Sequence, residues 1–99
     1  MDYEKRAEEL FREGYNCAQA VFLAFACEKM DRDEAARLAS AFGGGLAGTR
    51  NTCGAVSGLA MAYGLLRGYD DPTDKEAKRA EYEAVREMAE EFAQQNGSI

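Results

Sequence analysis

The chain has no histidine among its 99 residues. This absence excludes Cys–His and Ser–His–Asp catalysis within the chain and removes the commonest transition-metal ligand. Cysteine is also sparse, at three residues. In a reducing compartment, three cysteines in a small domain are more often core residues, reactive thiols or metal ligands than permanent disulfides.

Positive charge is scarce as well, because 12 Lys and Arg residues stand against 18 Asp and Glu residues and the net charge is −6. Nucleic-acid affinity comes mostly from clustered Lys and Arg, so we expect no nucleic-acid partner. The longest apolar run, CAQAVFLAFAC at residues 17–27, is well short of the roughly 20 residues that span a bilayer. The N-terminal residues MDYEKRAEEL contain no apolar signal core. We therefore expect a cytoplasmic protein without membrane insertion.

Helical periodicity runs through most of the chain, and no stretch alternates with the period of two that a strand requires. Residues 2–14 predict a first helix that ends at Gly14, because apolar residues recur on one face at spacings of three and four. Residues 17–30 predict a second helix capped by Asn16. This helix is apolar on nearly every side, so we expect it in the middle of a bundle. The inward-facing residues of the first helix are Tyr3, Ala7, Leu10 and Phe11.

Two further helices are predicted from their start and stop signals. Asp31, with Glu34 three positions later, resembles a capping box and starts a third helix that ends at glycines 43–45. A fourth helix covers residues 53–67 and ends at Gly68.

A fifth helix is predicted over residues 73–95, with Asp71 as its cap, Pro72 at the first helical position and Asp74 in the first turn. We therefore predict an all-α fold, an antiparallel bundle of about five helices that forms one domain over residues 1–99. Exposed apolar surface on so small a bundle would make a homodimer reasonable. The apolar stripe of the fifth helix is Ala77, Ala80, Ala84, Val85, Met88, Ala89 and Phe92.

Cys17 and Cys53 share a local context, because each is predicted in the first turn of a helix just after a capping side chain. Free backbone N–H groups and the positive end of the helix dipole favour a thiolate at such a position and make the thiol more reactive. Both are therefore candidate catalytic residues for redox or nucleophilic chemistry. A purely structural role as a small buried residue stays open for each.

Cys27 is predicted to differ from the other two cysteines. It follows Cys17 by ten residues on the same predicted helix, which places it about 15 Å further along the axis. This separation rules out a disulfide between them. The apolar residues FLAFA precede Cys27, so we expect it in the core. Cys17 and Cys53 could meet if their helices start at the same end of the bundle.

The stretch GGGLAG at residues 43–48 matches the letters of the dinucleotide fingerprint G-x-G-x-x-G. Its context is wrong, because a helix rather than a strand precedes it. We expect a helix stop and a tight turn with positive φ angles. A glycine-rich loop before a helix start can also bind an anion or cofactor. The candidate residues for such a site are Gly43, Gly44, Gly45, Arg50, Asn51 and Thr52.

The helix after this loop contains three glycines within it, and each costs roughly 1 kcal/mol relative to alanine. They are Gly54, Gly58 and Gly64. This cost indicates that another backbone or a cofactor approaches closely. We expect close packing against the second helix as the main cause.

Three segments, EGYNCAQAVFLAF, FGGGLAGTRNTCGAVSGLAMAYGL and FAQQNGSI, resemble the redox-active protein family named for its C-GCAxxG-C-C cysteine pattern. The most specific element is CGAxxG at residues 53–58. The resemblance implies a small helical fold and four characteristic cysteines, of which two map onto Cys17 and Cys53. The other two would lie beyond the NGSI at the end of this sequence, and Cys27 is not part of the pattern.

The resemblance and the cysteine positions lead to three hypotheses of function. The first is a thiol redox protein that uses Cys17 and Cys53 with an unidentified redox partner. The second is a metal or iron–sulfur module in which the same two thiolates are joined by two further cysteines. No cofactor is evident in the chain itself. The third is a helical interaction or oligomerisation domain in which the cysteines only pack.

Overall fold

The structure of the chain is a computed structural model that describes residues 2–50 and 53–96. These residues form helices and no strand, which confirms the all-α prediction. None of the helices in this part of the chain has the length and apolarity needed to cross a membrane. The elements, in chain order, are α1 (Tyr3–Arg12), α2 (Cys17–Ala26), α3 (Arg32–Ala39), the 3₁₀-helix η1 (Ser40–Phe42), α4 (Gly54–Arg67) and α5 (Lys75–Asn96).

Side-chain caps start the first three helices. Asp2, Asn16 and Asp31 each accept a hydrogen bond from the backbone N–H three residues later, at 3.0, 2.9 and 3.2 Å. Each bond pairs an N–H group that the first turn of a helix leaves without a partner. The predicted caps Asn16 and Asp31 are therefore confirmed.

The start of α5 differs from the prediction. Asp74 caps this helix by accepting the N–H of Ala77 at 3.0 Å, and the helix begins at Lys75. Asp71 instead accepts the N–H and the hydroxyl of Thr73, at 2.9 and 2.7 Å. These two bonds, the backbone bond first, hold the pKa of Asp71 below its ordinary value of 3.8. The predicted cap was wrong because the Asp71 carboxylate closes the preceding turn.

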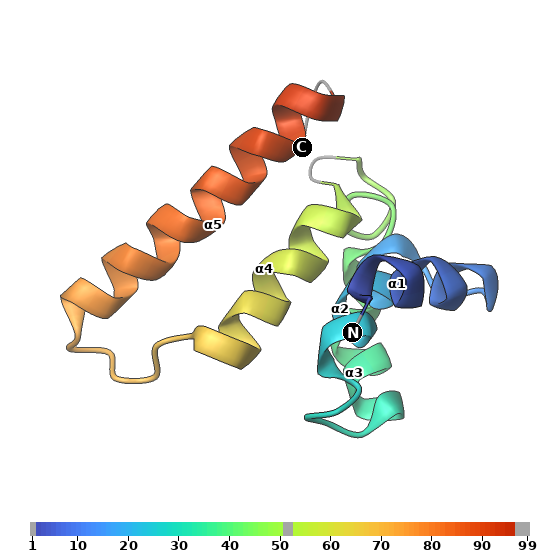
Figure 1. The fold of residues 1–99 in the computed structure, drawn as a ribbon, viewed down its shortest axis with the longest axis horizontal. Coiled ribbons are helices and arrows are strands. Elements are labelled where there is room, and N and C mark those ends of the chain that lie inside the picture. The colour runs from blue at the N-terminus through green and yellow to red at the C-terminus, as the bar shows by residue number, and fades with distance from the viewer. Residues whose placement is uncertain (1, 51–52, 97–99) are drawn as a thin grey trace.

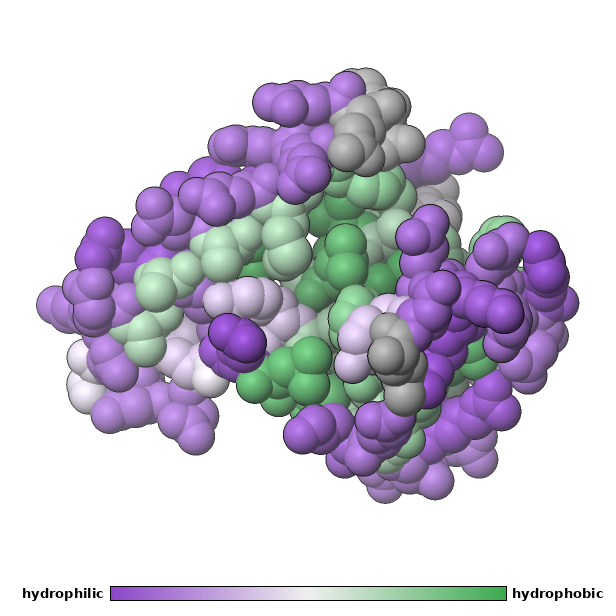
Figure 2. All heavy atoms as spheres, viewed as in Figure 1, coloured by the Kyte–Doolittle hydropathy of each residue, from purple (hydrophilic) through white to green (hydrophobic). Residues whose placement is uncertain are grey.

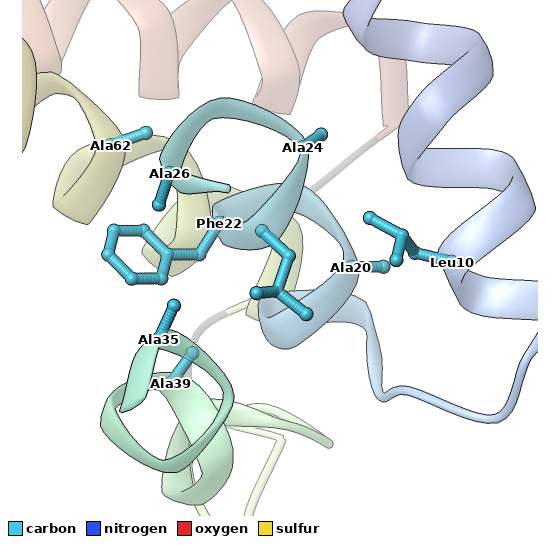
Figure 3. Packing of buried hydrophobic residues seen from close by; sticks show 9 residues of the cluster. Leu10, Ala20, Phe22, Ala24, Ala26, Ala35, Ala39 and Ala62 are labelled. Atoms are coloured by element: carbon cyan, nitrogen blue, oxygen red, sulfur yellow. The ribbon is translucent and has the colours of Figure 1, made fainter. Parts of the chain in front are cut away.

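The core is built around α2. Phe22 and Leu23 of this helix are the largest fully buried side chains. Leu10 of α1 points toward Ala20, and Phe22 lies beside Ala35 of α3 (Figure 3). Full burial of a Phe or Leu side chain stabilises a fold by about 1.5–3 kcal/mol. The central position predicted for the apolar second helix is therefore confirmed.

α1 buries less of its predicted face than expected. Leu10 is buried and Ala7 is half-buried, but Phe11 is 60% exposed. Phe11 lies about 100° around the helix from Leu10, off the narrow stripe that contacts α2. Tyr3 is exposed on one side and stacks on the ring of Phe25, with a centroid distance of 4.4 Å.

α4 and α5 form an antiparallel hairpin (Figure 1). The N–H of Tyr69 donates to Oε1 of Glu81 at 3.0 Å and closes the connection between the two helices. α5 packs against α4 and lies apart from α1, α2 and α3 in Figure 1. No side chain of α5 up to residue 94 is buried. Its predicted stripe is half-buried except at Ala80, which is exposed.

Candidate functional site

Cys17 is the first residue of α2, and a reciprocal pair of hydrogen bonds holds this helix start in place. The N–H of Gln19 donates to the Asn16 side chain at 2.9 Å, and the N–H of Asn16 donates to the Gln19 side chain at 3.0 Å. The Gln19 amide also donates to the carbonyl of Ala36 in α3 at 2.9 Å. The backbone that carries Cys17 is therefore tied to its own helix and to a neighbour.

Cys53 directly precedes α4, whereas it was predicted to be the first residue of that helix. It is the N-cap of α4, because the helix begins at Gly54, and its side chain makes no capping hydrogen bond. The predicted capping residues Asn51 and Thr52 lie outside the described residues. Cys53 is half-buried and its thiol is free, as is the thiol of Cys17.

The starts of α2 and α4 meet at Gly54, the residue that follows Cys53. A Cβ atom placed on Gly54 would overlap Sγ of Cys17. It would also lie 3.1 Å from the carbonyl oxygen of Phe42 and 3.2 Å from the backbone nitrogen of Ala18. The missing side chain of Gly54 therefore provides the space that the sulfur of Cys17 occupies. The two cysteines are brought to one junction between helix N-termini.

The next turn of α4 extends this close contact. A Cβ atom on Gly58 would lie 2.8 Å from the carbonyl oxygen of Ala18 and 3.0 Å from Cβ of Val21. Real Cβ atoms essentially never approach a backbone atom so closely. Glycines 54 and 58 therefore let α4 pack directly on the backbone of α2, as expected from the sequence.

The glycine-rich loop is attached to the same junction. The side-chain amide of Asn16 donates to the carbonyl of Ser40 at 3.1 Å. A Cβ atom on Gly43 would overlap the Asn16 side chain. The first residue of the loop therefore packs against the cap of the helix that carries Cys17.

Within the loop, the backbone N–H groups of residues 46–50 donate to carbonyls of residues 41–46, at 2.6 to 3.4 Å. An anion held by these N–H groups would have to displace the internal bonds. The side chain of Arg50 is exposed, so it could contact an anion without breaking the hydrogen bonds of the loop backbone. Binding of a cofactor by glycines 43–45 and Arg50 stays a prediction.

The loop also has an unusual backbone. Gly44, Gly45, Leu46 and Ala47 have consecutive positive φ angles of 63°, 73°, 69° and 50°. The left-handed region costs a non-glycine residue roughly 1–2 kcal/mol. Gly45 is also required sterically, because a Cβ atom there would overlap the backbone of Arg50. The predicted tight turn with positive φ angles is confirmed and continues into two residues that carry side chains.

Cys27 is not in the core, which corrects the sequence-based expectation. It is exposed and follows the last residue of α2, because this helix ends at Ala26 and not at Met30. A guanidinium nitrogen of Arg6 donates to Sγ of Cys27 at 2.7 Å and to the carbonyl of Ala24 at 3.2 Å. The chain leaves the core one residue before Cys27, and its sulfur therefore faces the surface.

The family model described as "Putative redox-active protein (C_GCAxxG_C_C)" matches residues 15–99. The chain belongs to this family. Cys17 and Cys53 both lie inside the matched region, and so do the glycine loop and the helix junction. No curated protein and no solved structure matches the chain.

The metal hypothesis depends on which side chains of this chain could bind a metal ion together. Among the described residues, no three His, Cys, Asp or Glu side chains gather as they would around a metal ion. A closed zinc or iron–sulfur site takes four protein ligands. Cys17 and Cys53 would therefore need ligands from outside this part of the chain.

Sequence analysis missed two residues that shape the surroundings of the cysteines. Gln19 was not singled out, although an N-cap followed three residues later by Gln is a capping-box signal. Arg6 was not singled out, and no local signal could have found it, because it lies 21 positions from Cys27 in the chain.

Proposed function

We propose that this chain is a dithiol redox protein in which Cys17 and Cys53 alternate between two thiols and one disulfide. The observation that carries the proposal is the packing of Cys17 Sγ against Gly54, directly beside Cys53. The redox description of the family supports a redox role in general terms.

The proposed reaction is thiol–disulfide exchange with a disulfide of a partner. The thiolate of one cysteine attacks the partner disulfide, forms a mixed disulfide and releases one partner thiolate. The second cysteine then attacks the mixed disulfide, which forms the Cys17–Cys53 bond and releases the other partner thiolate. The partner gains two electrons, its two thiolates take up the two protons that the cysteines lose, and the reverse reaction reduces the chain again.

The local structure suits this chemistry. Both cysteines lie at helix N-termini, Cys17 as the first residue of α2 and Cys53 as the N-cap of α4, and reactive cysteines of other proteins occur at such positions. Both cysteine residues are half-buried. A partner therefore has access to them, while the surrounding backbone holds their positions.

The test is mass-resolved alkylation of the reduced protein and of the protein after mild oxidation. We expect Cys17 and Cys53 to lose labelling together after oxidation and to appear as one linked peptide pair. Cys27 is exposed, so it should be labelled before oxidation and should not join this pair. The variant Cys27→Ser is the matched control and should keep the linked pair, whereas Cys17→Ser or Cys53→Ser should remove it.

Other outcomes would identify the other functions. Independent labelling of Cys17 and Cys53 after oxidation would contradict the proposal. Labelling of neither residue until the protein unfolds would favour an interaction domain with packed thiols. Visible absorbance and bound metal that disappear in Cys17→Ser and Cys53→Ser would favour the metal or iron–sulfur module.

A further inference from the structure

Gly54 differs from Gly58, the next glycine of α4, in the kind of atom that occupies the space of its missing side chain. A Cβ atom on Gly58 would lie nearest a backbone atom, the carbonyl oxygen of Ala18 at 2.8 Å. A Cβ atom on Gly54 would overlap a side-chain atom, Sγ of Cys17. Both glycines bring α4 close to α2, but Gly54 also makes room for a thiol that the proposed reaction uses.

The sulfur of Cys17 has few alternative positions. The backbone that carries it is held by the Asn16–Gln19 capping box and by the bond from Gln19 to the carbonyl of Ala36. With this backbone held, Sγ moves only by rotation about χ1, which favours three staggered positions about 120° apart. A Cβ atom at position 54 would therefore force Sγ into a different rotamer, unless α4 moved away from α2.

Apolar packing opposes such a movement of α4. Figure 2 shows hydrophobic side chains gathered over α4 in the middle of this face of the molecule, with a hydrophilic surface around them. Val56, in the first turn of α4, and Ala62 further along this helix are buried. Moving α4 outward would return apolar surface to water, which is unfavourable. The rotamer of Cys17 is therefore the part of this contact that can change.

The position of this sulfur matters because Gly54 directly follows Cys53. Adjacent Cα atoms lie about 3.8 Å apart, so a sulfur held against Gly54 is close to the second cysteine. A disulfide tolerates little displacement, since its two Cβ atoms lie about 3.5–4.5 Å apart and its dihedral angle is restricted. Turning Sγ of Cys17 away from Gly54 would therefore make a Cys17–Cys53 bond less favourable.

We propose that Gly54 is a positioning residue of the Cys17–Cys53 pair. The space left by its missing side chain holds the Cys17 sulfur in the rotamer that reaches Cys53, and thereby sets how readily the disulfide forms. This inference rests on the proposed function. The bond forms when the two thiols transfer two electrons and two protons to an external disulfide, which is reduced to two thiols. Gly54 acts through the position of Sγ, whereas Gly58 acts on helix packing alone.

The test is the equilibrium of the whole chain with mixtures of reduced and oxidised glutathione, measured by mass-resolved alkylation. One glutathione disulfide becomes two glutathione thiols for each Cys17–Cys53 bond that forms. Gly54→Ala should lower the equilibrium constant of this reaction by at least about tenfold, which is about 30 mV for a two-electron couple, because a displaced sulfur strains the bond. Gly58→Ala is the matched control, which should lower stability and leave the equilibrium constant unchanged.

Unfolding in reducing buffer tests the contact itself without a redox step. Cys17→Ala removes Sγ and leaves the neighbours of position 54 in the backbone of Phe42 and Ala18 in place. Gly54→Ala should therefore lower the urea midpoint less in the Cys17→Ala chain than in the wild type. If Gly54→Ala alone is too unstable to fold, the chain with both changes should fold again.

The outcomes separate this inference from the proposed function. A wild-type disulfide that Gly54→Ala leaves unchanged would overturn the role of Gly54 and leave the proposed function standing. The same holds for an equal effect of Gly58→Ala on the equilibrium constant, or for an equal loss of stability with and without Cys17→Ala. A wild type that forms no Cys17–Cys53 disulfide at any glutathione ratio would overturn both.

Discussion

The region around α2 and the α4–α5 hairpin differ in how completely they bury their apolar faces. α2 is covered by α1, α3 and α4, and six of its ten residues are buried. α5 packs against α4, and none of its side chains up to residue 94 is buried. Both helices were expected to face a core. The comparison shows that a helix reaches full burial only where neighbours cover it on several sides.

α4 packs against α2 on one side and against α5 on the other, and a glycine lies at each of these two contacts. Gly58 meets the backbone of α2, whereas Gly64 faces Glu81 of α5 at an ordinary contact distance. The first contact has no room for a methyl group, and the second has. The tightness of packing therefore changes across a single helix.

The largest expected effect is at the centre of α2. Leu23→Ala should lower the free energy of unfolding by about 3 kcal/mol, because it leaves a cavity where Leu23 is fully buried. Leu65→Ala on α4, where the side chain is 39% exposed, should cost less than about 1 kcal/mol. Urea denaturation followed by circular dichroism measures both. Equal losses would remove the contrast between the two regions.

A smaller effect separates the two faces of α4. Gly58→Ala should lower the free energy of unfolding by about 1–3 kcal/mol, because its Cβ would press on the carbonyl of Ala18. Gly64→Ala is the matched control, since its Cβ would lie 3.7 Å from Oε2 of Glu81, which is an ordinary contact distance. It should be neutral or stabilising by up to about 1 kcal/mol. Thermal and urea unfolding would measure the change in the free energy of unfolding for both variants. A stabilising effect of Gly58→Ala would contradict the close packing of α4 on α2.

The smallest effect lies in the turn between the two hairpin helices. NMR titration should find the pKa of Asp71 below 3.8, because its carboxylate accepts two hydrogen bonds from Thr73. Because the pKa is lowered in the folded protein, the two hydrogen bonds of the Asp71 carboxylate stabilise the fold at pH values above the ordinary pKa. This stabilisation is lost as the pH falls through the lowered pKa. Thr73→Ala should move the pKa part of the way back, since the backbone bond remains. Thr73→Ser keeps the hydroxyl and should leave the pKa low, and a normal pKa in the wild type would refute the turn geometry.

Much of the helical framework was predictable because its signals are local. Asn16 and Asp31 bond N–H groups only three residues away, so their pattern is visible in a short stretch of sequence. The start of α5 shows the limit of such signals. Asp71 and Asp74 are both good capping residues, and the hydrogen bonds to Thr73 leave Asp74 as the cap.

The candidate site was predictable in part for the same reason. Cys17 and Cys53 could be singled out because each lies at a helix start and both belong to a family motif. The contact between Cys17 Sγ and Gly54 could not be predicted, because it joins segments more than thirty residues apart. Their pairing in a redox reaction stays a proposal.

The sequence by itself determined which segments are helices and where most of them begin, because capping bonds and apolar periodicity act over three or four residues. Only the tertiary structure decided which side of each helix is covered. Cys27 and Phe11 are exposed although an apolar residue directly precedes each of them. Gly58 meets the carbonyl of Ala18, and α5 stays half-buried. Burial depends on which distant segments meet, and a side chain's sequence neighbours do not contain that information.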